Sequence, residues 1–470
     1  MTKKLLIINP VQQVERQEFW NESAVRIMQY PPTNLAYLAA LTPPGWDIRI
    51  ADETIEPLTF EDADLVGITA LTPTAPRAYA ISERYRQRGI KTVMGGIHVS
   101  MLPDEAIQFT DAVVTGEAES VWQDLIHDFE RNELKTFYRG EHTPLQNLVN
   151  PRRDLLSNKY VLNLGGVETA RGCPNDCEFC SVTAFNGRKY RARPVEQVLD
   201  ELESIDNKNI FFSDNTLLGY GEKAEQRAIQ LFRGMVDRGL NKRWFSQVNI
   251  DIAYRPEVLK WARKSGCSGL AIGFESINED ALQAMHKVRN LKVGVGRYRE
   301  GVNRVHDHGI AVAGAFVLGS DGDTKDVFQR TTEFIIDSKV DATQITILTP
   351  LPGTRLYSSL RQEGRLLRTN YPDDWAHYDF TEVVFRPKHM TPDELMEGTT
   401  QIYRDTSSRP TSLKRAFISL IRTKDLYGAA IAYLWNRGSG SLWMKKYEYM
   451  KGLSPSGVED SCLLRPVSGN

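Results

Sequence analysis

The stretch Arg171-Gly172-Cys173-Pro174-Asn175-Asp176-Cys177-Glu178-Phe179-Cys180 places three cysteines close together on a loop that is stiffened by a proline. Thiolates at such short spacings, here C-x3-C-x2-C, are typical ligands of iron–sulfur clusters. A structural zinc site needs four protein ligands, and residues 143–266 contain no other Cys or His. The sequence therefore predicts that Cys173, Cys177 and Cys180 hold one [4Fe–4S] cluster and leave one of its irons open.

At this loop the chain resembles the radical S-adenosylmethionine (SAM) enzymes, whose hallmark is the C-x3-C-x2-C sequence. In that family the open iron holds the amino and carboxylate groups of SAM. The resemblance implies that one electron from the cluster cleaves SAM, and that the resulting 5′-deoxyadenosyl radical removes hydrogen from an unactivated carbon. It also implies an electron donor such as flavodoxin or ferredoxin. Phe179 is expected to shield the cluster and to pack near the adenine of SAM.

The length and composition of the chain indicate a globular protein of several domains. A chain of 470 residues is too long for one ordinary core, so two or three domains are expected. The net charge of −2 gives no general surface for polyanions, so we expect no nucleic-acid partner. The N-terminus does not resemble a signal peptide, and five cysteines with three clustered argue for a reducing cytosol. We therefore expect a cytoplasmic location.

Residues 1–145 alternate short apolar runs with helical stretches, which is typical of a Rossmann-like, doubly wound parallel sheet in an α/β protein. The predicted strands are 5–10, 47–50, 65–69, 91–96 and 112–114, and two predicted helices are 33–41 and 76–88. In such sheets a ligand binds beyond the C-terminal ends of the strands. Those ends are rich in glycine and hydroxyl groups here, which let the backbone approach a large ligand closely.

This half resembles the cobalamin-binding domain that precedes the barrel in one radical SAM subclass. The resemblance lies in Pro-Pro-x-Asn-Leu-x-x-Leu-Ala at 31–39, a Gly-Gly-x-His turn and a Gly-Glu-x-Glu turn. It implies cobalamin contacts at the strand ends, namely at Thr69, Leu71, Thr72, Gly95, Gly96, His98, Gly116 and Glu117.

One departure from many cobalamin proteins concerns the ligand of cobalt. Those proteins carry Asp-x-His-x-x-Gly after the first strand, and its His binds cobalt, whereas residues 9–13 of this chain contain no His. His98 has two interpretations, a turn residue bonded to backbone or a contact of the corrin or its nucleotide tail. We expect cobalamin without a protein histidine on cobalt.

Residues 146–385 contain six further strand-like runs, and a helical segment follows nearly every one. The runs are 166–170, 209–212, 244–248, 269–273, 310–318 and 344–348. Six βα units predict a partial (β/α)6 version of the (β/α)8 barrel, with its chemistry at the C-terminal strand ends.

The strand ends of this barrel match the radical SAM pattern in order. The resemblance implies that Asp214 lies near SAM, that Glu275 hydrogen-bonds the SAM ribose and that Gly319 allows close contact with adenine. Ser246 and Gln247 are expected to face the same barrel mouth. Asp214 or Glu275 alone would more simply be a turn or cap residue, and it is the match at successive strands that favours the SAM site. No catalytic side chain beyond these cofactor contacts is expected.

Residues 386–470 are predicted to form a helical C-terminal region with a flexible tail from Ser454. A capped helix begins at Thr391, and residues 413–422 and 429–435 mix apolar and basic positions. A basic amphipathic helix can lie on a membrane surface. The alternative is a helix that packs on the barrel, so the sequence leaves both a cytoplasmic and a membrane-associated protein open.

The layout as a whole most resembles the hopanoid methylases and the anaerobic Mg-protoporphyrin ester cyclase group. It implies a cobalamin-dependent radical SAM C-methyltransferase that acts on a hydrophobic lipid or tetrapyrrole-like substrate. One alternative is a ring-forming or oxidising enzyme that uses cobalamin without net methyl transfer. Another is an iron–sulfur binding or redox-sensing protein, which would not need a ribose-binding Glu275.

Overall fold

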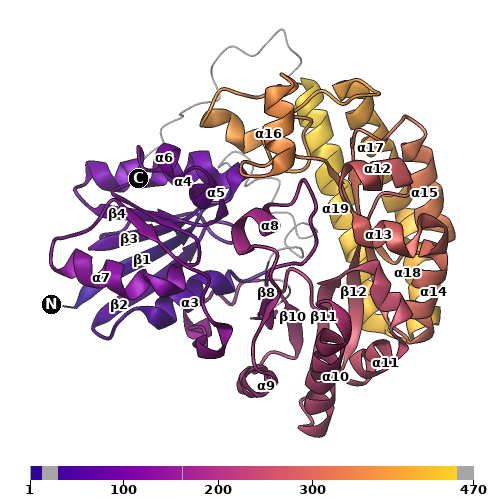
Figure 1. Cartoon of the computed structure of the whole chain (residues 1–470), viewed down its shortest axis with the longest axis horizontal. Coiled ribbons are helices and arrows are strands. Elements are labelled where there is room, and N and C mark those ends of the chain that lie inside the picture. The colour runs from indigo at the N-terminus through magenta and orange to yellow at the C-terminus, as the bar shows by residue number, and fades with distance from the viewer. Residues whose placement is uncertain (1, 13–29, 161, 163, 453–470) are drawn as a thin grey trace.

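Two six-stranded parallel sheets form the body of the protein (Figure 1). The computed structural model describes residues 2–12, 30–160, 162 and 164–452. The predicted tail from Ser454 lies outside the described residues. Within the described part of the chain, no helix is long and apolar enough to cross a membrane.

The first sheet has the strand order β2-β1-β3-β4-β5-β6, and all of its pairs are parallel. Its strands are β1 (Lys3–Asn9), β2 (Trp46–Asp52), β3 (Leu65–Thr69), β4 (Lys91–Gly95), β5 (Ala112–Thr115) and β6 (Phe137–Arg139). Its helices are α3 (Thr33–Leu41), η2 (Thr72–Thr74), α4 (Ala75–Gln87), α5 (Ile97–Met101), α6 (Pro103–Ala106), η3 (Ala118–Ser120) and α7 (Trp122–Glu130). The strand order reverses beside β1, as in a doubly wound sheet, so the predicted fold class is confirmed.

Both faces of this sheet are covered because side chains along each strand alternate between them. In β1, Leu6 and Ile8 join the core with α4, whereas Leu5 and Ile7 join the core with α3 and α7. A strand that is buried on both faces reads as a continuous apolar run, which explains why the sequence pattern revealed it.

The second sheet has its strands in consecutive order, from β7 at one edge to β14 at the other. The strands are β7 (Gly165–Val167), β10 (Asn209–Phe212), β11 (Arg243–Val248), β12 (Cys267–Glu275), β13 (Ala311–Leu318) and β14 (Ala342–Ile347). The helices between them are α8 (Ser181–Asn186), α9 (Val195–Ser204), α10 (Gly221–Asp237), η6 (Ile250–Tyr254), α11 (Pro256–Lys264), α12 (Glu279–Ala284), α13 (Val288–Val293), η7 (Val295–Arg297), α14 (Tyr298–Asp307) and α15 (Val327–Asp337). This arrangement is the predicted partial barrel.

The first barrel strand differs from the prediction of 166–170. It ends at Val167, and the next residues form β8 (Ala170–Arg171), which pairs antiparallel with β9 (Arg191–Ala192). The cause is Asp214, whose Oδ1 accepts hydrogen bonds from the backbone N–H of Thr169 at 2.6 Å and of Ala170 at 3.1 Å. These backbone groups are therefore bound by a side chain and not by the sheet.

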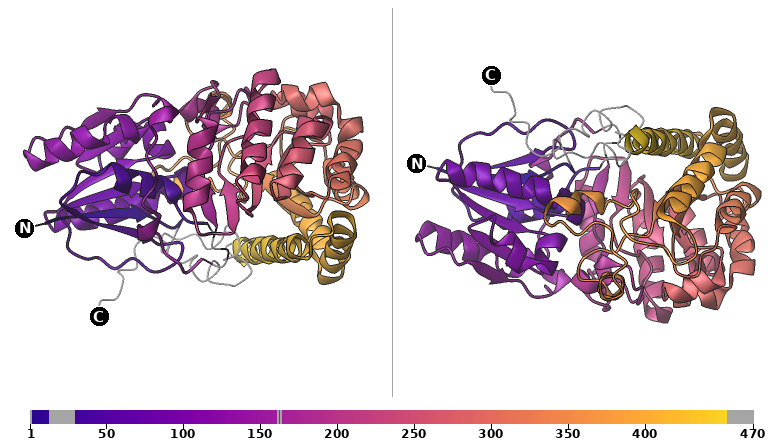
Figure 2. Two further views of the ribbon diagram at one scale, coloured as in Figure 1. Left: turned by 90° about the horizontal axis from the view of Figure 1, so that it is seen from below. Right: turned by 90° about the horizontal axis from the view of Figure 1, so that it is seen from above.

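The outer edge of β14 is covered by the C-terminal helices, which Figure 2 shows along one side of the barrel. These helices are α17 (Pro392–Ser407), α18 (Arg409–Thr423) and α19 (Leu426–Gly452). The backbone N–H of Thr343 donates to Asn436 of α19, and that of Ile345 donates to Tyr403 of α17. Edge groups of a sheet need such partners. The predicted cap is present, because Thr391 and Glu394 form a capping box at the start of α17.

The C-terminal ends of the two sheets face each other. Helix α5, after β4 of the first sheet, contacts α8, which follows the cysteine loop of the second. After β14 come α16 (Arg355–Gln362) and η8 (Asp373–His377), and η8 contacts η2 and α4 of the first sheet. The connection between the sheets contains η4 (Leu145–Asn147) and η5 (Arg153–Leu155). Ligands of both sheets would therefore meet between them.

Candidate active site

The cysteine loop is held in one conformation by contacts from several elements of the barrel. Gly172 has φ +83°, and a Cβ there would lie 2.3 Å from the Lys189 carbonyl oxygen, so this position requires glycine. Its backbone N–H donates to Asn215 Oδ1 at 3.1 Å. Arg355 of α16 donates to both the carboxylate and the carbonyl oxygen of Asp176, at 2.9 and 2.7 Å. The loop is thus bound to the segments after β10 and β14.

The three cysteines of the loop are free thiols, and Cys177 lies near enough to the other two for them to affect its pKa. Burial raises the pKa of Cys177 to about 12, and the thiols of Cys173 and Cys180 act on it in the same direction. Among the described residues, no three His, Cys, Asp or Glu side chains converge on a single metal ion. Three thiols without a further donor fit a [4Fe–4S] cluster in which each cysteine binds a different iron.

A buried ion pair lies beside these thiols. Lys287 Nζ donates to Glu275 Oε1 at 2.9 Å, and the two side chains are only 7% and 13% exposed. Burial lowers the pKa of Lys287, but the neighbouring Glu275 carboxylate opposes this and the pKa is raised overall, so the ammonium stays protonated. Sequence reasoning found Glu275 but missed Lys287, because nothing in the segment 284–287 distinguishes it from a surface lysine.

The backbone at Glu275 is irregular, and its carboxylate lies over Gly273 of the same strand. Glu275 has φ +59°, and the pairing of β12 with β13 shifts register between Gly273 and Glu275. Asn290 Nδ2 donates to the carbonyl oxygens of Gly273 at 2.9 Å and Phe274 at 3.0 Å, which satisfies the freed backbone groups. Such bulges often re-aim a side chain next to an active site.

The other predicted SAM contacts have varied surroundings. Asp214 is buried under the segment that leads to the cysteine loop, and burial raises its pKa to about 7. Gly319 has φ +97°, and a Cβ there would lie 2.6 Å from the Leu395 side chain of α17. Phe179 is partly buried and packs against the barrel core.

The expectation that Ser246 and Gln247 face the same mouth is wrong, because neighbouring residues of a strand point to opposite faces. Ser246 is fully buried and donates to the Phe212 carbonyl oxygen at 2.9 Å. It shares its face with Trp244, which stacks on Phe232 of α10, so Ser246 lies on the side that the helices cover. Gln247 is exposed on the other side.

The predicted cobalamin contacts lie on the edge of the first sheet that faces the barrel. Gly96 has φ +103°, and a Cβ there would lie 2.7 Å from the Ala70 carbonyl oxygen. Gly116 has φ +73°, and its Cβ would lie 2.2 Å from the Gly140 carbonyl oxygen. Leu71 is 52% exposed beside them, so this edge offers an apolar surface next to tight turns. Close backbone turns and an open apolar side chain fit a large, flat ligand such as a corrin.

His98 is fully buried beneath this edge. Its Nδ1 lies 3.3 Å from Thr72 Oγ1, and its Nε2 lies 3.2 Å from Tyr79 Oη and 3.3 Å from Glu105 Oε1. Glu105 also accepts from Trp375 of η8, so this network continues to the barrel side. Both ring nitrogens of His98 are therefore engaged within the protein.

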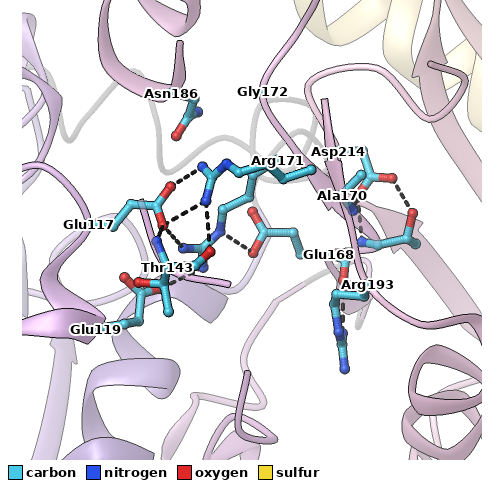
Figure 3. A network of polar contacts seen from close by, with 12 residues as sticks. Glu117, Glu119, Thr143, Glu168, Ala170, Arg171, Gly172, Asn186, Arg193 and Asp214 are labelled. Atoms are coloured by element: carbon cyan, nitrogen blue, oxygen red, sulfur yellow. Dashed lines mark hydrogen bonds and ion pairs between the residues drawn. The ribbon is translucent and has the colours of Figure 1, made fainter. Parts of the chain in front are cut away.

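Glu117, the remaining predicted cobalamin contact, belongs to an ion network that joins the first sheet to the β8–β9 pair at the start of the cysteine loop (Figure 3). Its carboxylate pairs with Arg191 of β9 and lies 3.2 Å from Arg171 Nη1 of β8. Arg171 also binds Glu119 at 2.5 Å and Glu168 at 2.8 Å. The side chain of Glu117 is 2% exposed and that of Arg171 is 9% exposed. The network thus fixes the start of the cysteine loop against the turn after β5.

Comparisons with known proteins agree with both halves of this arrangement. Residues 167–335 match the Radical SAM superfamily, and residues 24–126 match the B12 binding domain. The bacteriochlorophyllide d C-12(1)-methyltransferase of Chlorobaculum tepidum is 31% identical over 429 residues, which cover 88% of this chain and 89% of that protein. The hopanoid C-2 methylase of Rhodopseudomonas palustris is 29% identical over 350 residues, or 72% of this chain and 65% of that protein.

A solved structure shares the fold over almost the whole chain. The radical SAM methyltransferase TsrM from Kitasatospora setae, determined with cobalamin and a [4Fe–4S] cluster bound, has a TM-score of 0.66 at 16% identity. The likeness covers 96% of this chain and 100% of that one. The chain belongs to the Radical SAM superfamily. Within it, the protein is a cobalamin-dependent methyltransferase with a [4Fe–4S] cluster, SAM and cobalamin as cofactors, which favours an enzyme over a redox sensor.

Proposed function

We propose that this enzyme methylates an unactivated carbon of a hydrophobic substrate, and that the substrate is a tetrapyrrole or a similar flat ring system. A relative that matches over 89% of its own length is named for a bacteriochlorophyllide, whereas the hopanoid C-2 methylase matches over 65% of its length. These relatives support a large apolar substrate, either a tetrapyrrole or a hopanoid lipid. The inner face of the barrel supports the flat tetrapyrrole.

The observation that carries this proposal is the composition of the concave inner face of the barrel. Ala271 and Gly273 of β12 and Ala313 and Ala315 of β13 lie there, on the face opposite the buried core, and no side chain among them exceeds a methyl group. These positions alternate with the core residues of the same strands. Ala271, Ala313 and Ala315 leave room for a broad ligand, and apolar residues favour an apolar ligand. Over Gly273 the space is taken by the Glu275 carboxylate, which a Cβ there would approach to 2.5 Å.

Aromatic side chains lie on the neighbouring strands β10 and β11 of this inner face. Phe211 of β10 and Phe245 of β11 stack with ring centroids 4.7 Å apart, and Tyr30 meets Phe211 edge-on at 5.2 Å. Tyr30 is 55% exposed, so part of this aromatic surface is open. Aromatic rings offer a flat conjugated substrate favourable stacking.

In this proposal the side chains hold the cofactors in fixed positions between the two sheets. The cluster supplies the electron that cleaves SAM, and cobalamin carries the methyl group, when both are bound. Cys173, Cys177 and Cys180 hold the cluster on a loop fixed by Asp176 and Gly172. We assign Glu275 to the SAM ribose, and the turns at Thr69, Thr72, Gly95, Gly96 and Gly116 to cobalamin.

Anaerobic turnover with a panel of substrates tests the substrate class. The reduced, cofactor-loaded enzyme would be given SAM with a chlorophyllide-type tetrapyrrole, and in parallel with a pentacyclic hopanoid lipid. We expect a mass gain of one methyl group, less the hydrogen it replaces, on the tetrapyrrole alone. Methylation of the hopanoid alone would contradict the tetrapyrrole assignment while leaving methyl transfer intact.

A further inference from the structure

Helix α18 has the reverse of the amphipathic pattern of an ordinary surface helix. Its buried face consists of Ser412, Arg415, Ser419 and Thr423, at spacings of three and four residues. Ser412 and Ser419 are 0% exposed. A helix on a globular protein normally turns its apolar stripe toward the core and its polar face toward water.

The outward face of this helix is apolar. Leu413, Phe417 and Ile421 follow one another at intervals of four residues and are 58%, 64% and 60% exposed. Leu426, which begins α19 just beyond the end of α18, is 71% exposed. These are the four most exposed large hydrophobic side chains among the residues that the structure describes. Single exposed apolar residues are normal, but a continuous row of them marks an interaction surface.

Specific contacts hold α18 in this orientation. Arg415 donates to the Val340 carbonyl oxygen at 3.0 and 2.9 Å and to the Thr406 carbonyl oxygen at 3.0 Å. Rotating the helix to bury Phe417 would remove these bonds and leave the carbonyl groups without their partner. The small serines on the same face also allow the close packing of α18 on α19. The apolar row is therefore displayed by the fold.

The charged side chains of α18 itself are all positive. Arg409, Lys414 and Lys424 are exposed beside it, and residues 409–424 include no Asp or Glu. Amphipathic helices of this composition lie in the plane of a membrane interface, with apolar side chains among the acyl chains and basic ones at anionic headgroups. We propose that α18 binds flat to the surface of an anionic lipid bilayer through Leu413, Phe417 and Ile421.

A second copy of the chain is a poorer fit for this surface. A symmetric dimer places the same patch on both subunits, so the row would meet itself. That contact would also bring the lysines of the two copies, Lys414 and Lys424, close to one another, and like charges repel. An anionic surface pairs with the same lysines. Membrane binding by α18 does not depend on which substrate the enzyme methylates.

Flotation with lipid vesicles tests the proposal on the full chain. Vesicles of phosphatidylcholine alone would be compared with vesicles that also contain phosphatidylglycerol. We expect the protein to float with the anionic vesicles, and the triple variant Leu413→Gln/Phe417→Gln/Ile421→Gln to lose about tenfold or more in affinity. The control Phe137→Gln/Val236→Gln/Leu367→Gln removes three scattered exposed hydrophobics and should bind like wild type.

The charges can be tested separately. Lys414→Gln/Lys424→Gln should weaken binding about fivefold for each lysine, and Lys208→Gln/Lys292→Gln, at exposed sites elsewhere, should not. Circular dichroism melting would establish that each variant is folded. Absence of vesicle binding by wild type, or equal binding by the α18 variants, would overturn the proposal. A dimer in sedimentation velocity that only the triple variant dissociates would show that a second copy covers the face.

Discussion

Arg171 Nη2 lies 2.5 Å from Glu119 Oε1, and this contact links the residue two positions before the first cluster cysteine to the turn after β5. The same guanidinium reaches Glu117, which Arg191 also binds. The cysteine loop is therefore fixed directly to the edge of the sheet that we assign to cobalamin. A buried network of this kind makes the spacing between the two cofactor sites a property of the fold.

The Glu117 carboxylate should make stability depend on pH. Burial raises its pKa, but the hydrogen bond from Arg191 and the charge of Arg171 lower it below its ordinary value of 4.5. A carboxylate whose pKa is lower in the folded than in the unfolded state stabilises the fold at pH values above its unfolded-state pKa. This stabilisation is lost as the pH falls through its folded-state pKa. Glu117→Gln should cost about 3–5 kcal/mol at neutral pH, because it leaves buried arginines without their charge partner.

Thermal melting between neutral and acidic pH checks this prediction. The difference in melting temperature between wild type and Glu117→Gln should shrink as pH drops below 4.5. Asp154→Asn, which removes a carboxylate 60% exposed beside Arg152, serves as the matched control and should change little. A constant difference across the whole pH range would contradict the role of the ionised carboxylate.

The three loop cysteines should be necessary for cluster binding, whereas Cys267 should not be necessary. Cys173→Ala/Cys177→Ala/Cys180→Ala should show no iron–sulfur absorption after anaerobic reconstitution. Cys267→Ala is the control, because that thiol is fully buried at the start of β12 and packs in the barrel core. We expect wild-type iron content in the control. Full iron loading of the triple variant would show that the cluster has other ligands.

Glu275→Gln should weaken SAM binding by about ten- to a hundredfold, since it removes one charge-assisted hydrogen bond. It should also lower stability, because Lys287 would stay buried without its partner. Adding Lys287→Met removes both charges and should restore much of the melting temperature. Equilibrium dialysis would then show whether SAM affinity stays low. Recovery of affinity in the double variant would mean that Glu275 acts only through the ion pair.

His98→Ala should retain the cobalamin spectrum and change its affinity only modestly. The ring is fully buried and both nitrogens are bonded to Thr72, Tyr79 and Glu105, so neither is available to cobalt. Paramagnetic resonance of the cob(II)alamin form should show no nitrogen superhyperfine splitting. Splitting in wild type that disappears in His98→Ala would identify His98 as the axial ligand.

Local sequence patterns were sufficient for the elements whose structure depends on burial along one strand or helix. The strand at 209–212 and the helix at 33–41 have the predicted bounds, because apolar spacing and a terminal turn define both. The three-residue strand β6 was missed, since Phe137 and Arg139 are exposed and only pairing with β5 makes it a strand. Pairing partners far along the chain leave no local signal.

The site was predictable to the extent that its residues belong to a motif. The cysteines and Glu275 stand at positions the family pattern marks, whereas Lys287 and Arg171 gain their importance from partners 12 and 52 positions away. The composition of α18 suggested an amphipathic helix, but only the structure shows that its polar face is the buried one. The face of α18 that packs inward is decided by the carbonyl groups of Val340 and Thr406, which lie elsewhere in the chain and accept hydrogen bonds from Arg415.

The transfer of a methyl group to carbon is the central claim, and isotope labelling tests it most directly. The reduced holoenzyme would be given SAM with a trideuterated methyl group and a chlorophyllide-type tetrapyrrole, and the product would be examined by mass spectrometry. We predict a product that carries all three deuterium atoms on one new methyl group. A product that has lost hydrogen or closed a ring without gaining deuterium would contradict methyl transfer and identify a cyclase or oxidase.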